Sequence, residues 1–283
     1  DKYGTIIVGE EAKRILNGTK IEEIKRSMGT NKIVKLGDKE YSPEEISAEI
    51  LKKLKEEAED FLGEEIDEAV ITVPAMFNSI QKAATIKAGE LAGLKVERII
   101  SEPTAAAMAY GIENMEKYQK ILVYDFGGGT FDVSILELDD GILDVIATSG
   151  DNYLGGKDID EILIKNIPVK IEDDVEKIKL KLEVEEAKKR LSTLMGTDII
   201  VPELNIDYEL KREKFEELIS PLVNKTIDFI DKALSSAKLK REDIDVVLLV
   251  GGTTRIPLVQ ETLKNIFGSK VKKFGDPQEA VAL

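Results

Sequence analysis

The chain has 283 residues, of which 42% are hydrophobic and 34% are charged, and its formal net charge is −15. That length and apolar content are enough for two domains or one large one, while the acidity disfavours nucleic acid and anionic membranes as partners. The absence of cysteine and histidine excludes disulfides, thiol nucleophiles, a Ser-His-Asp triad, a histidine-ligated zinc and a His-Arg-Asp kinase loop.

Any chemistry in this chain must therefore use Asp, Glu, Lys and Thr, with or without a metal ion. No apolar run is long enough to span a bilayer, and no signal peptide is recognisable at the start. The sequence begins at Asp1 without Met and stops at Leu283 within a pattern typical of a helix. We therefore expect a fragment of a longer protein, or a chain from which segments are missing.

The first hundred residues predict short helices followed by strand–helix units. We expect helices over 8–16 and 21–28, the second ended by Gly29, and a hairpin over 32–41. Ser42-Pro43-Glu44-Glu45 is a strong helix start, because Ser42 can cap, Pro43 suits the first turn and Glu45 can complete a capping box. The elements expected after it are a helix ending at Gly63, a strand over 69–73, a helix through Leu91 that Asn78 and Gln81 can cap, a strand over 96–100 and a small-residue helix over 104–110.

The middle of the chain is organised around a glycine turn, Asp125-Phe126-Gly127-Gly128-Gly129-Thr130-Phe131-Asp132. Strands over 121–126, 130–138 and 142–148 are expected to form an antiparallel meander around it. Three glycines allow dihedrals that a Cβ would forbid and let backbone N–H groups converge on an anion. With an acid at each edge of the turn, phosphate, metal and carboxylate can meet there. For the glycines alone, a purely structural hairpin is an equally good interpretation.

A second strand-to-glycine turn follows the apolar strand expected over 246–250. A strand that is apolar throughout is typical of the centre of a sheet, and this one leads into Gly251-Gly252-Thr253-Thr254-Arg255 before Pro257 opens a helix. This is a candidate anion or nucleotide site at the carboxyl end of a buried strand, although glycine pairs often only permit a tight turn. Two such turns from distant segments suggest a cleft site in a mixed α/β protein.

The segment between the two turns is mostly charged and helical. After a glycine turn over 152–156, the expected elements are helix over 158–184 broken at Pro168, helix over 184–194, two strands within 198–210 and helix within 211–237. Pro221 is predicted to start a second helix within the last of these, after a cap at Ser220.

Some charged groups have ordinary structural explanations on sequence grounds. The basic pair Lys25-Arg26 is typical of a solvated surface, and a glutamate before a proline, as in Glu102-Pro103, is usually a helix cap. The periodicity of the helix face that carries Glu185, Lys188, Lys189 and Ser192 favours a solvated face with ion pairs three residues apart.

Several motifs nevertheless occur together in a specific order. The longest are Glu102-Pro103-Thr104-Ala105-Ala106-Ala107-Met108-Ala109-Tyr110-Gly111, the stretch from Asp125 to Ser134 and the stretch from Gly251 to Pro257. Shorter ones are Ile24-Lys25-Arg26 with Met28-Gly29, Val73-Pro74-Ala75 with Phe77-Asn78, and Leu154-Gly155-Gly156 with Asp158. Jointly they resemble the nucleotide-binding domain of the Hsp70 (DnaK-type) chaperones over nearly the whole chain. The joint pattern is much more specific than either glycine turn.

The resemblance implies an α/β, actin-like ATPase fold of the ribonuclease H-like type, with two lobes around a cleft for ATP or ADP and magnesium. Lobe I is expected over 1–117 and is incomplete, with an outer subdomain over 1–42 and an inner one over 43–117. Lobe II is expected over 118–283, with 118–156 and 210–283 as the inner subdomain and 157–209 as a small outer one.

The resemblance also implies roles for individual residues. The expected catalytic residues are Lys25, Glu102, Asp125, Thr130 and Asp132. All of them except Thr130 are expected to position the attacking water and stabilise the γ-phosphate. Asp125 is further expected to hold magnesium through its water shell, and Thr130 matches a threonine that autophosphorylates in bacterial members. The expected nucleotide-binding residues are Gly127, Gly128, Gly129 and Thr130 at the phosphates, Glu185, Lys188, Lys189 and Ser192 on one side of the adenosine, and Gly251, Gly252, Thr253, Thr254 and Arg255 on the other. The resemblance thus overrides the solvated-face interpretation.

The sequence also departs from the family's pattern. The family opens with a strand and a first phosphate loop rich in Asp, Gly and Thr, which nothing before Tyr3 supplies. If the protein lacks that loop, we expect impaired hydrolysis and reduced nucleotide affinity; if only this sequence lacks it, the site is ordinary. The substituted positions are Lys189 for a frequent Arg, Met76, Ser79 and Lys82 for Tyr, Asp and Arg, and Gln278 for Asp. The segment between Asp160 and Glu185 is also shorter than usual, so the outer subdomain is expected to be trimmed.

By resemblance, the expected function is ATP hydrolysis that drives binding and release of unfolded client proteins through a substrate-binding domain missing from this sequence. A J-domain co-chaperone and a nucleotide-exchange factor are the expected partners, nucleic acid and membranes are not, and the location is cytoplasmic. The alternatives are an actin-like filament protein or sugar kinase on the same fold, and a nucleotide-binding module that has lost hydrolysis. The 102–111 string and Phe131-Asp132-Val133-Ser134 favour the chaperone.

Overall fold

The computed structural model of the chain describes residues 5–16, 18–111, 118–169, 171, 173–272 and 275–282. Contacts divide the chain into two compact units, Asp1–Ser101 (unit 1) and Glu102–Leu283 (unit 2), and each is described by itself. The lobe boundary expected between residues 117 and 118 is a different division of the chain, and it stays a prediction.

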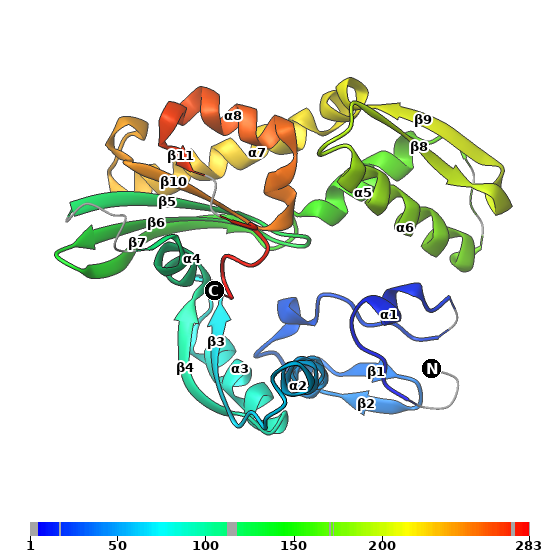
Figure 1. Cartoon of the computed structure of the whole chain (residues 1–283), viewed down its shortest axis with the longest axis horizontal. Coiled ribbons are helices and arrows are strands. Elements are labelled where there is room, and N and C mark those ends of the chain that lie inside the picture. Colours follow the sequence, from blue (N-terminus) through cyan, green and yellow to red (C-terminus); the bar gives the residue numbers. More distant parts are fainter. Residues whose placement is uncertain are drawn as a thin grey trace. The chain divides into compact units, whose positions relative to one another are not determined.

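Unit 1 is built from short hairpin and turn elements followed by two longer helices. Its elements are α1 Glu10–Arg14, the 3-10 helix η1 Ile24–Ser27, β1 Val34–Leu36, β2 Lys39–Tyr41, α2 Pro43–Leu62, β3 Glu68–Val73, α3 Ser79–Leu91 and β4 Lys95–Ser101. β1 and β2 form the expected hairpin, β3 and β4 pair in parallel, and α2 packs against α3 (Figure 1). The helix predicted over 21–28 is wrong in extent. Glu23 adopts a left-handed conformation with φ of 56°, so only the single turn η1 follows it.

The two long helices of unit 1 begin as their sequences predict. The Ser42 hydroxyl accepts the Glu45 N–H at 3.3 Å, and the Glu45 carboxylate accepts the Ser42 N–H at 2.7 Å, so the capping box of α2 is complete. Asn78 and Gln81 make the same reciprocal pair at the start of α3, at 2.9 and 3.1 Å. Gly63 ends α2 with φ of 74°, the left-handed conformation that glycine adopts at low cost.

Unit 2 is a five-stranded mixed sheet with helices on both faces. Its elements are α4 Glu102–Gly111, β5 Tyr118–Phe126, β6 Phe131–Asp139, β7 Ile142–Asp151, α5 Gly156–Asn166, α6 Asp174–Arg190, β8 Gly196–Val201, η3 Pro202–Leu204, β9 Ile206–Lys211, α7 Arg212–Ala237, η4 Arg241–Asp243, β10 Val246–Val250, η5 Gly252–Arg255, α8 Pro257–Phe267, η6 Gly268–Lys270 and β11 Val271–Lys272. The strand order is β11-β10-β5-β6-β7, and β5, β6 and β7 form the predicted antiparallel meander. α4 lies on one face of the sheet and α7 and α8 on the other, while α5, α6, β8 and β9 group beside them (Figure 1).

The core of unit 2 explains why its central strands are so apolar. All five residues of β10 are buried, because β10 lies between β5 and β11 with helices on both faces. On the α7 side, the rings of Tyr124, Phe126 and Phe131 are fully buried and pack edge to face, with centroids 4.8 to 6.1 Å apart. On the α4 side, the small side chains of Ala106 and Ala107 let the helix approach the sheet closely.

Three predicted boundaries in unit 2 are wrong. α7 is one continuous helix through Pro221, because Ile219 and Val223 bury on either side of it while Pro221 itself faces solvent, where water can satisfy the released carbonyl. α6 passes through Val184, since Leu180, Val184 and Ala187 form one buried stripe. Residues 277–282 form turns, not the expected helix, and Leu283 lies outside the described residues.

Candidate functional site

The sheet of unit 2 brings the two glycine turns to one edge. β10 runs parallel to β5, and Val250 pairs with Asp125 in the register of the two strands. The turn after β10 (Gly251–Arg255) and the turn after β5 (Gly127–Thr130) therefore leave the sheet side by side. This is the arrangement in which ligands bind beyond the carboxyl ends of parallel strands.

Hydrogen bonds to the backbone carbonyls of the first glycine turn join it to the second glycine turn and to a third segment, the start of α5. The carbonyl oxygen of Gly127 accepts the Thr253 hydroxyl at 2.8 Å and the Gly156 N–H at 3.0 Å. The carbonyl of Gly128 accepts the Lys157 N–H at 2.9 Å, from the first turn of α5. Two segments that are distant from the hairpin in sequence, the Gly251–Arg255 turn and the start of α5, thus hold it in a single conformation.

Steric contacts show why glycine is required where the backbones of these segments approach each other. A Cβ at Gly155 would lie 2.5 Å from the Gly128 carbonyl oxygen, and one at Gly251 would lie 2.4 Å from that of Phe126. Gly251 also has a φ of 84°, which side chains rarely tolerate. Around the Gly128 Cα, by contrast, nothing described lies within 4 Å of the Cβ position. The interlocked backbones therefore leave the outer side of the hairpin open to a ligand.

Two carboxylates lie at the root of this hairpin, that is, where its turn joins β5 and β6. Asp125 and Asp132 are directly opposed across β5 and β6, so their half-buried side chains share one face of the sheet. Their Oδ1 atoms lie beside Gly251 and Gly150, each 2.9 Å from the Cβ position of that glycine. Glu102 begins α4 in the same unit, whereas Lys25 lies exposed on η1 and is described within unit 1 alone.

The expected residues of α6 divide into two kinds. Lys188 reaches the glycine turns: its Nζ donates to the Gly156 carbonyl at 2.8 Å and lies 2.7 Å from Asp160 Oδ1. Lys189 is half exposed and pairs instead with Glu185 at 3.0 Å and Glu186 at 2.7 Å. Burial opposes the charged form, but these two carboxylates raise the pKa of Lys189 above its ordinary value. Ser192 follows the helix end, its N–H donating to the Lys189 carbonyl at 3.1 Å.

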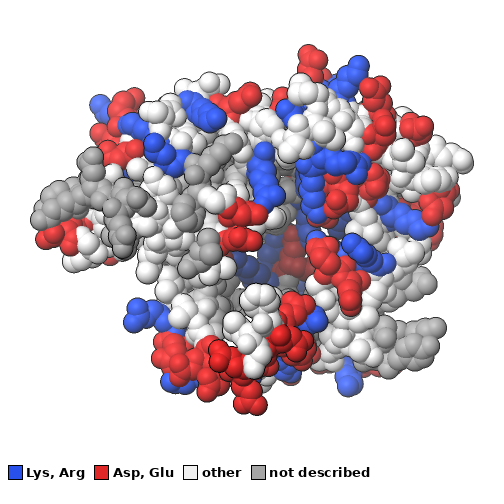
Figure 2. All heavy atoms as spheres, in the orientation of Figure 1, with Lys and Arg blue, Asp and Glu red and all other residues white. Residues whose placement is uncertain are grey.

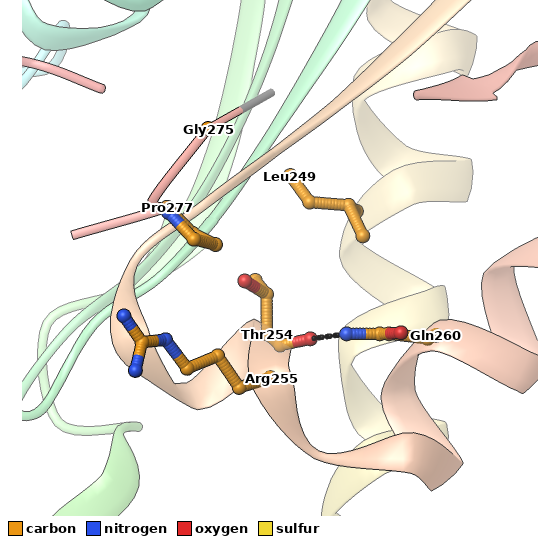
Figure 3. Close-up of a pocket in the computed structure, with 6 residues that line it drawn as sticks. All are labelled: Leu249, Thr254, Arg255, Gln260, Gly275 and Pro277. Atoms are coloured by element: carbon orange, nitrogen blue, oxygen red, sulfur yellow. Dashed lines mark hydrogen bonds between the residues drawn. The ribbon is translucent and has the colours of Figure 1, made fainter. Parts of the chain in front are cut away.

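The second glycine turn is supported from behind by the segment after β11. The Gly251 N–H donates to the Pro277 carbonyl at 2.9 Å, and the Gln278 amide packs against Gly252. Arg255 forms an ion pair with Asp276, whose pKa this guanidinium lowers. The pocket behind the turn has a volume of about 170 Å³, and Gln260 Nε2 donates to the Thr254 carbonyl there at 2.8 Å (Figure 3). Its lining residues are Leu249, Thr254, Arg255, Gln260, Gly275 and Pro277.

Sequence reasoning missed two acids of this region. Asp160 is buried at Lys188, and Asp276 holds Arg255. For Asp160 a signal was present, because it lies beside Ile159 on the face of α5 that Leu163 also buries. For Asp276 nothing in the pattern pointed to Arg255, which is distant in sequence.

The structure also shows how charge is distributed over one face and what character the described helices have. Asp and Glu are interspersed with Lys and Arg over the face shown in Figure 2, so the net charge of −15 is not gathered into a single acidic patch there. Within the described ranges, none of the helices combines the length and apolar character needed to cross a membrane.

A buried sheet whose adjacent parallel strands end in interlocked glycine turns, with carboxylates at their root, defines a phosphate- or nucleotide-binding class of protein. The chain belongs to the Hsp70 family: the family model "Hsp70 protein" matches residues 8–283. The family has the actin-like ATPase fold, so the predicted fold class is confirmed. Members of this family bind nucleotide and are ATPases. The match to the Hsp70 family over residues 8–283 decides against the filament and sugar-kinase alternatives.

Individual relatives agree with the family assignment. "Chaperone protein DnaK" of Thermosipho melanesiensis is 51% identical over 302 residues, which cover 100% of this chain and 51% of the relative. The proteins of the same name from Thermotoga maritima and Mycoplasma mobile are 49% identical over 303 residues and 51% identical over 301 residues, again over 100% of this chain and 51% and 50% of theirs. The chain thus spans about half the length of the curated relatives it matches.

Proposed function

We propose that this chain is the nucleotide-binding domain of an Hsp70-type chaperone, which binds ATP or ADP with Mg²⁺ and hydrolyses ATP. The observation that carries the proposal is the interlock of three glycine-containing segments through the carbonyls of Gly127 and Gly128, at 2.8 to 3.0 Å. Such a backbone platform suits an anionic ligand, because no side chain blocks the approach to Gly128, where nothing described lies within 4 Å of the Cβ position.

Within this proposal, Gly127, Gly128, Gly129 and Thr130 hold the phosphates. The adenosine lies between Glu185, Lys188, Lys189 and Ser192 on one side and Gly251, Gly252, Thr253, Thr254 and Arg255 on the other. The contact of Lys188 with Gly156 supports the first set, since it brings α6 against the phosphate turn. Contacts of Pro277 and Gln278 with the Gly251–Arg255 turn support the role of that turn as the other side of the adenosine site.

The residues present fit a magnesium ion. Mg²⁺ keeps several of its waters and needs only one or two carboxylates, and Asp125 and Asp132 face each other at the root of the turn. Among the described residues no group of three or more Asp or Glu side chains is placed to hold a metal ion. When bound, the ion supplies charge neutralisation at the phosphates.

For hydrolysis, we propose that Lys25, Glu102, Asp125 and Asp132 orient the attacking water and stabilise the γ-phosphate, and that Thr130 can accept a phosphoryl group. Phosphoryl transfer needs positioning and electrostatic stabilisation more than covalent help, which a chain without histidine or cysteine can supply. In the whole protein, ATP turnover would drive binding and release of unfolded client proteins, assisted by a J-domain co-chaperone and a nucleotide-exchange factor in the cytoplasm.

Isothermal titration with Mg-ADP tests the binding part of this proposal. We expect saturable binding with a stoichiometry of one nucleotide per chain. No detectable heat at millimolar nucleotide would overturn the proposed function.

Single-turnover hydrolysis tests the catalytic part. We expect Lys25→Ala to slow the chemical step strongly, because the positive charge near the γ-phosphate is lost. Lys35→Ala is the matched control, since Lys35 is also an exposed lysine of unit 1 but lies on β1. If the unsubstituted chain and Lys25→Ala both bind nucleotide but hydrolyse it equally slowly, Lys25 has no catalytic role. The chain would then be a nucleotide-binding module without hydrolysis.

A further inference from the structure

One buried acid of unit 2 lies outside the expected site residues. Asp160 is on α5, four residues after Gly156, and its side chain is only 4% exposed. Burial raises the pKa of Asp160, and the neighbouring Lys188 ammonium opposes that rise. A buried carboxylate is unfavourable unless a partner compensates it. The compensating group here comes from a different helix, since Lys188 Nζ on α6 lies 2.7 Å from Asp160 Oδ1.

The Lys188 ammonium of this pair contacts the backbone beside the glycine turns. Lys188 Nζ donates to the Gly156 carbonyl at 2.8 Å, and its side chain is 12% exposed. A Cβ at Gly156 would lie 3.1 Å from Lys188 Nζ and 2.9 Å from Thr253 Oγ1. Because that Thr253 hydroxyl donates to the Gly127 carbonyl, the ammonium adjoins the atoms that fix the phosphate turn.

The Lys188 ammonium has more N–H groups than described partners, so it can also donate to a ligand. An ammonium carries three N–H groups, and in the part of the chain that the structure describes its partners are Asp160 and the Gly156 carbonyl. A lysine stem has four rotatable bonds, so an ammonium that is not held by such partners samples many positions. Holding it in one position lowers the entropic cost of a further contact.

We propose that Asp160 is a positioning residue for nucleotide binding: its carboxylate fixes the Lys188 ammonium beside Gly156, where the remaining N–H meets an oxygen of the bound nucleotide. This inference rests on the proposed function of the same site. Asp160 itself does not touch the nucleotide, and acts only through Lys188.

Four variants of the chain separate positioning from simple stabilisation. They are Asp160→Asn, Lys188→Met, the double variant of both, and Glu161→Gln as the control. Glu161 is the next residue of α5, and its exposed carboxylate lies 3.8 Å from Lys165, away from Lys188. Each variant is titrated with Mg-ADP by calorimetry and melted thermally without nucleotide.

We expect Asp160→Asn and Lys188→Met each to weaken Mg-ADP binding about tenfold, the worth of one charge-assisted hydrogen bond. Glu161→Gln should bind like the unsubstituted chain. Both single variants should also melt earlier, because each leaves one buried charge without its partner. The double variant leaves neither charge unpaired, so it should regain thermal stability while its affinity stays as low as that of Lys188→Met. If its affinity recovers together with its stability, or if Asp160→Asn binds like the unsubstituted chain, the proposal is overturned.

A readout without nucleotide separates this inference from the proposed function. Acetylation of Lys188 by an amine-reactive reagent, followed by mass spectrometry, should be severalfold faster in Asp160→Asn than in the unsubstituted chain, and unchanged in Glu161→Gln. Equal labelling in all three would show that Asp160 does not hold Lys188. Faster labelling in a chain that fails to bind Mg-ADP would overturn the proposed function but support the fixation of Lys188 by Asp160.

Discussion

Unit 2 and unit 1 bury their side chains very differently. Unit 2 has helices on both faces of a five-stranded sheet, with the rings of Tyr124, Phe126 and Phe131 fully buried in its core. The described part of unit 1 has only two-stranded sheets, and its buried clusters are small and rich in alanine, such as Ala84 with Ala88. Phe61 on α2 remains 89% exposed.

The difference in burial bears directly on how firmly the candidate site residues are held. Each glycine turn of unit 2 leaves a buried strand and is locked by hydrogen bonds to distant segments, so its conformation is set by the core beneath it. Lys25, the expected catalytic residue of unit 1, is an exposed residue on a single turn of 3-10 helix. We therefore expect substitutions in unit 2 to affect stability and ligand binding together, and substitutions in unit 1 to have smaller effects on stability.

The strongest test of the comparison exchanges one phenylalanine in each unit for alanine. Phe131→Ala removes a ring that packs on Tyr124 at 4.8 Å and Phe126 at 5.3 Å, so we expect a loss of about 3–5 kcal/mol in the free energy of unfolding. Phe61→Ala should change it by less than about 0.5 kcal/mol, because that ring is already solvated. Urea unfolding measures both. A comparable loss for the two variants would contradict the contrast between the units.

The second test breaks the glycine interlock of unit 2. In Gly155→Ala the new Cβ meets the Gly128 carbonyl at 2.5 Å, a backbone contact that cannot rotate away. We expect a destabilisation of about 1–3 kcal/mol, the usual range for overpacking, together with clearly weaker Mg-ADP binding. Gly196→Ala is the control, because its Cβ would meet only the Leu210 carbonyl at 3.8 Å. Unchanged Mg-ADP affinity in Gly155→Ala would remove the interlock from the binding argument.

A milder substitution asks whether one hydrogen bond of that interlock matters. Thr253→Val deletes the hydroxyl that donates to the Gly127 carbonyl at 2.8 Å but keeps the shape. We expect a loss of about 1.5 kcal/mol in stability and a several-fold weaker affinity for Mg-ADP. In the control Thr262→Val, the deleted hydroxyl bonds only to the Leu258 carbonyl of its own helix. The prediction fails if calorimetry finds the same affinity for both variants.

The smallest expected effects lie in unit 1, at the capping box of α2. Ser42→Ala should destabilise that helix by about 1 kcal/mol. Hydrogen bonds from the backbone and side chain of Ser42 lower the pKa of Glu45. A carboxyl group with a lowered pKa in the folded state stabilises it above its ordinary pKa, and that stabilisation is lost as the pH falls through the lowered value. Glu45→Gln should therefore lose less stability than the unsubstituted chain as the pH falls, as followed by unfolding monitored by circular dichroism. The same dependence of stability on pH in both chains would show that Glu45 does not contribute to it.

Local sequence was enough wherever the deciding contacts lie within a few residues. The capping boxes at Ser42 and Asn78, the C-cap Gly63 and the antiparallel meander were all predicted from short patterns and are confirmed. Where burial competes with a local signal, the prediction was wrong. Pro221 does not interrupt α7, and no boundary exists at Val184, because buried side chains continue through both positions.

The two glycine turns, the acids at the root of the first one and the apolar strands that lead into them could be predicted from sequence, since each is a contiguous motif with its own backbone requirement. Long-range contacts place the turns at one sheet edge and bring Gly156 and Thr253 to the Gly127 carbonyl, to which both donate. They also bring Lys188 into this cluster, while Lys189 pairs with its own helix. Strand order and the burial of Asp160 depend on contacts between residues far apart in the chain, which no local pattern encodes.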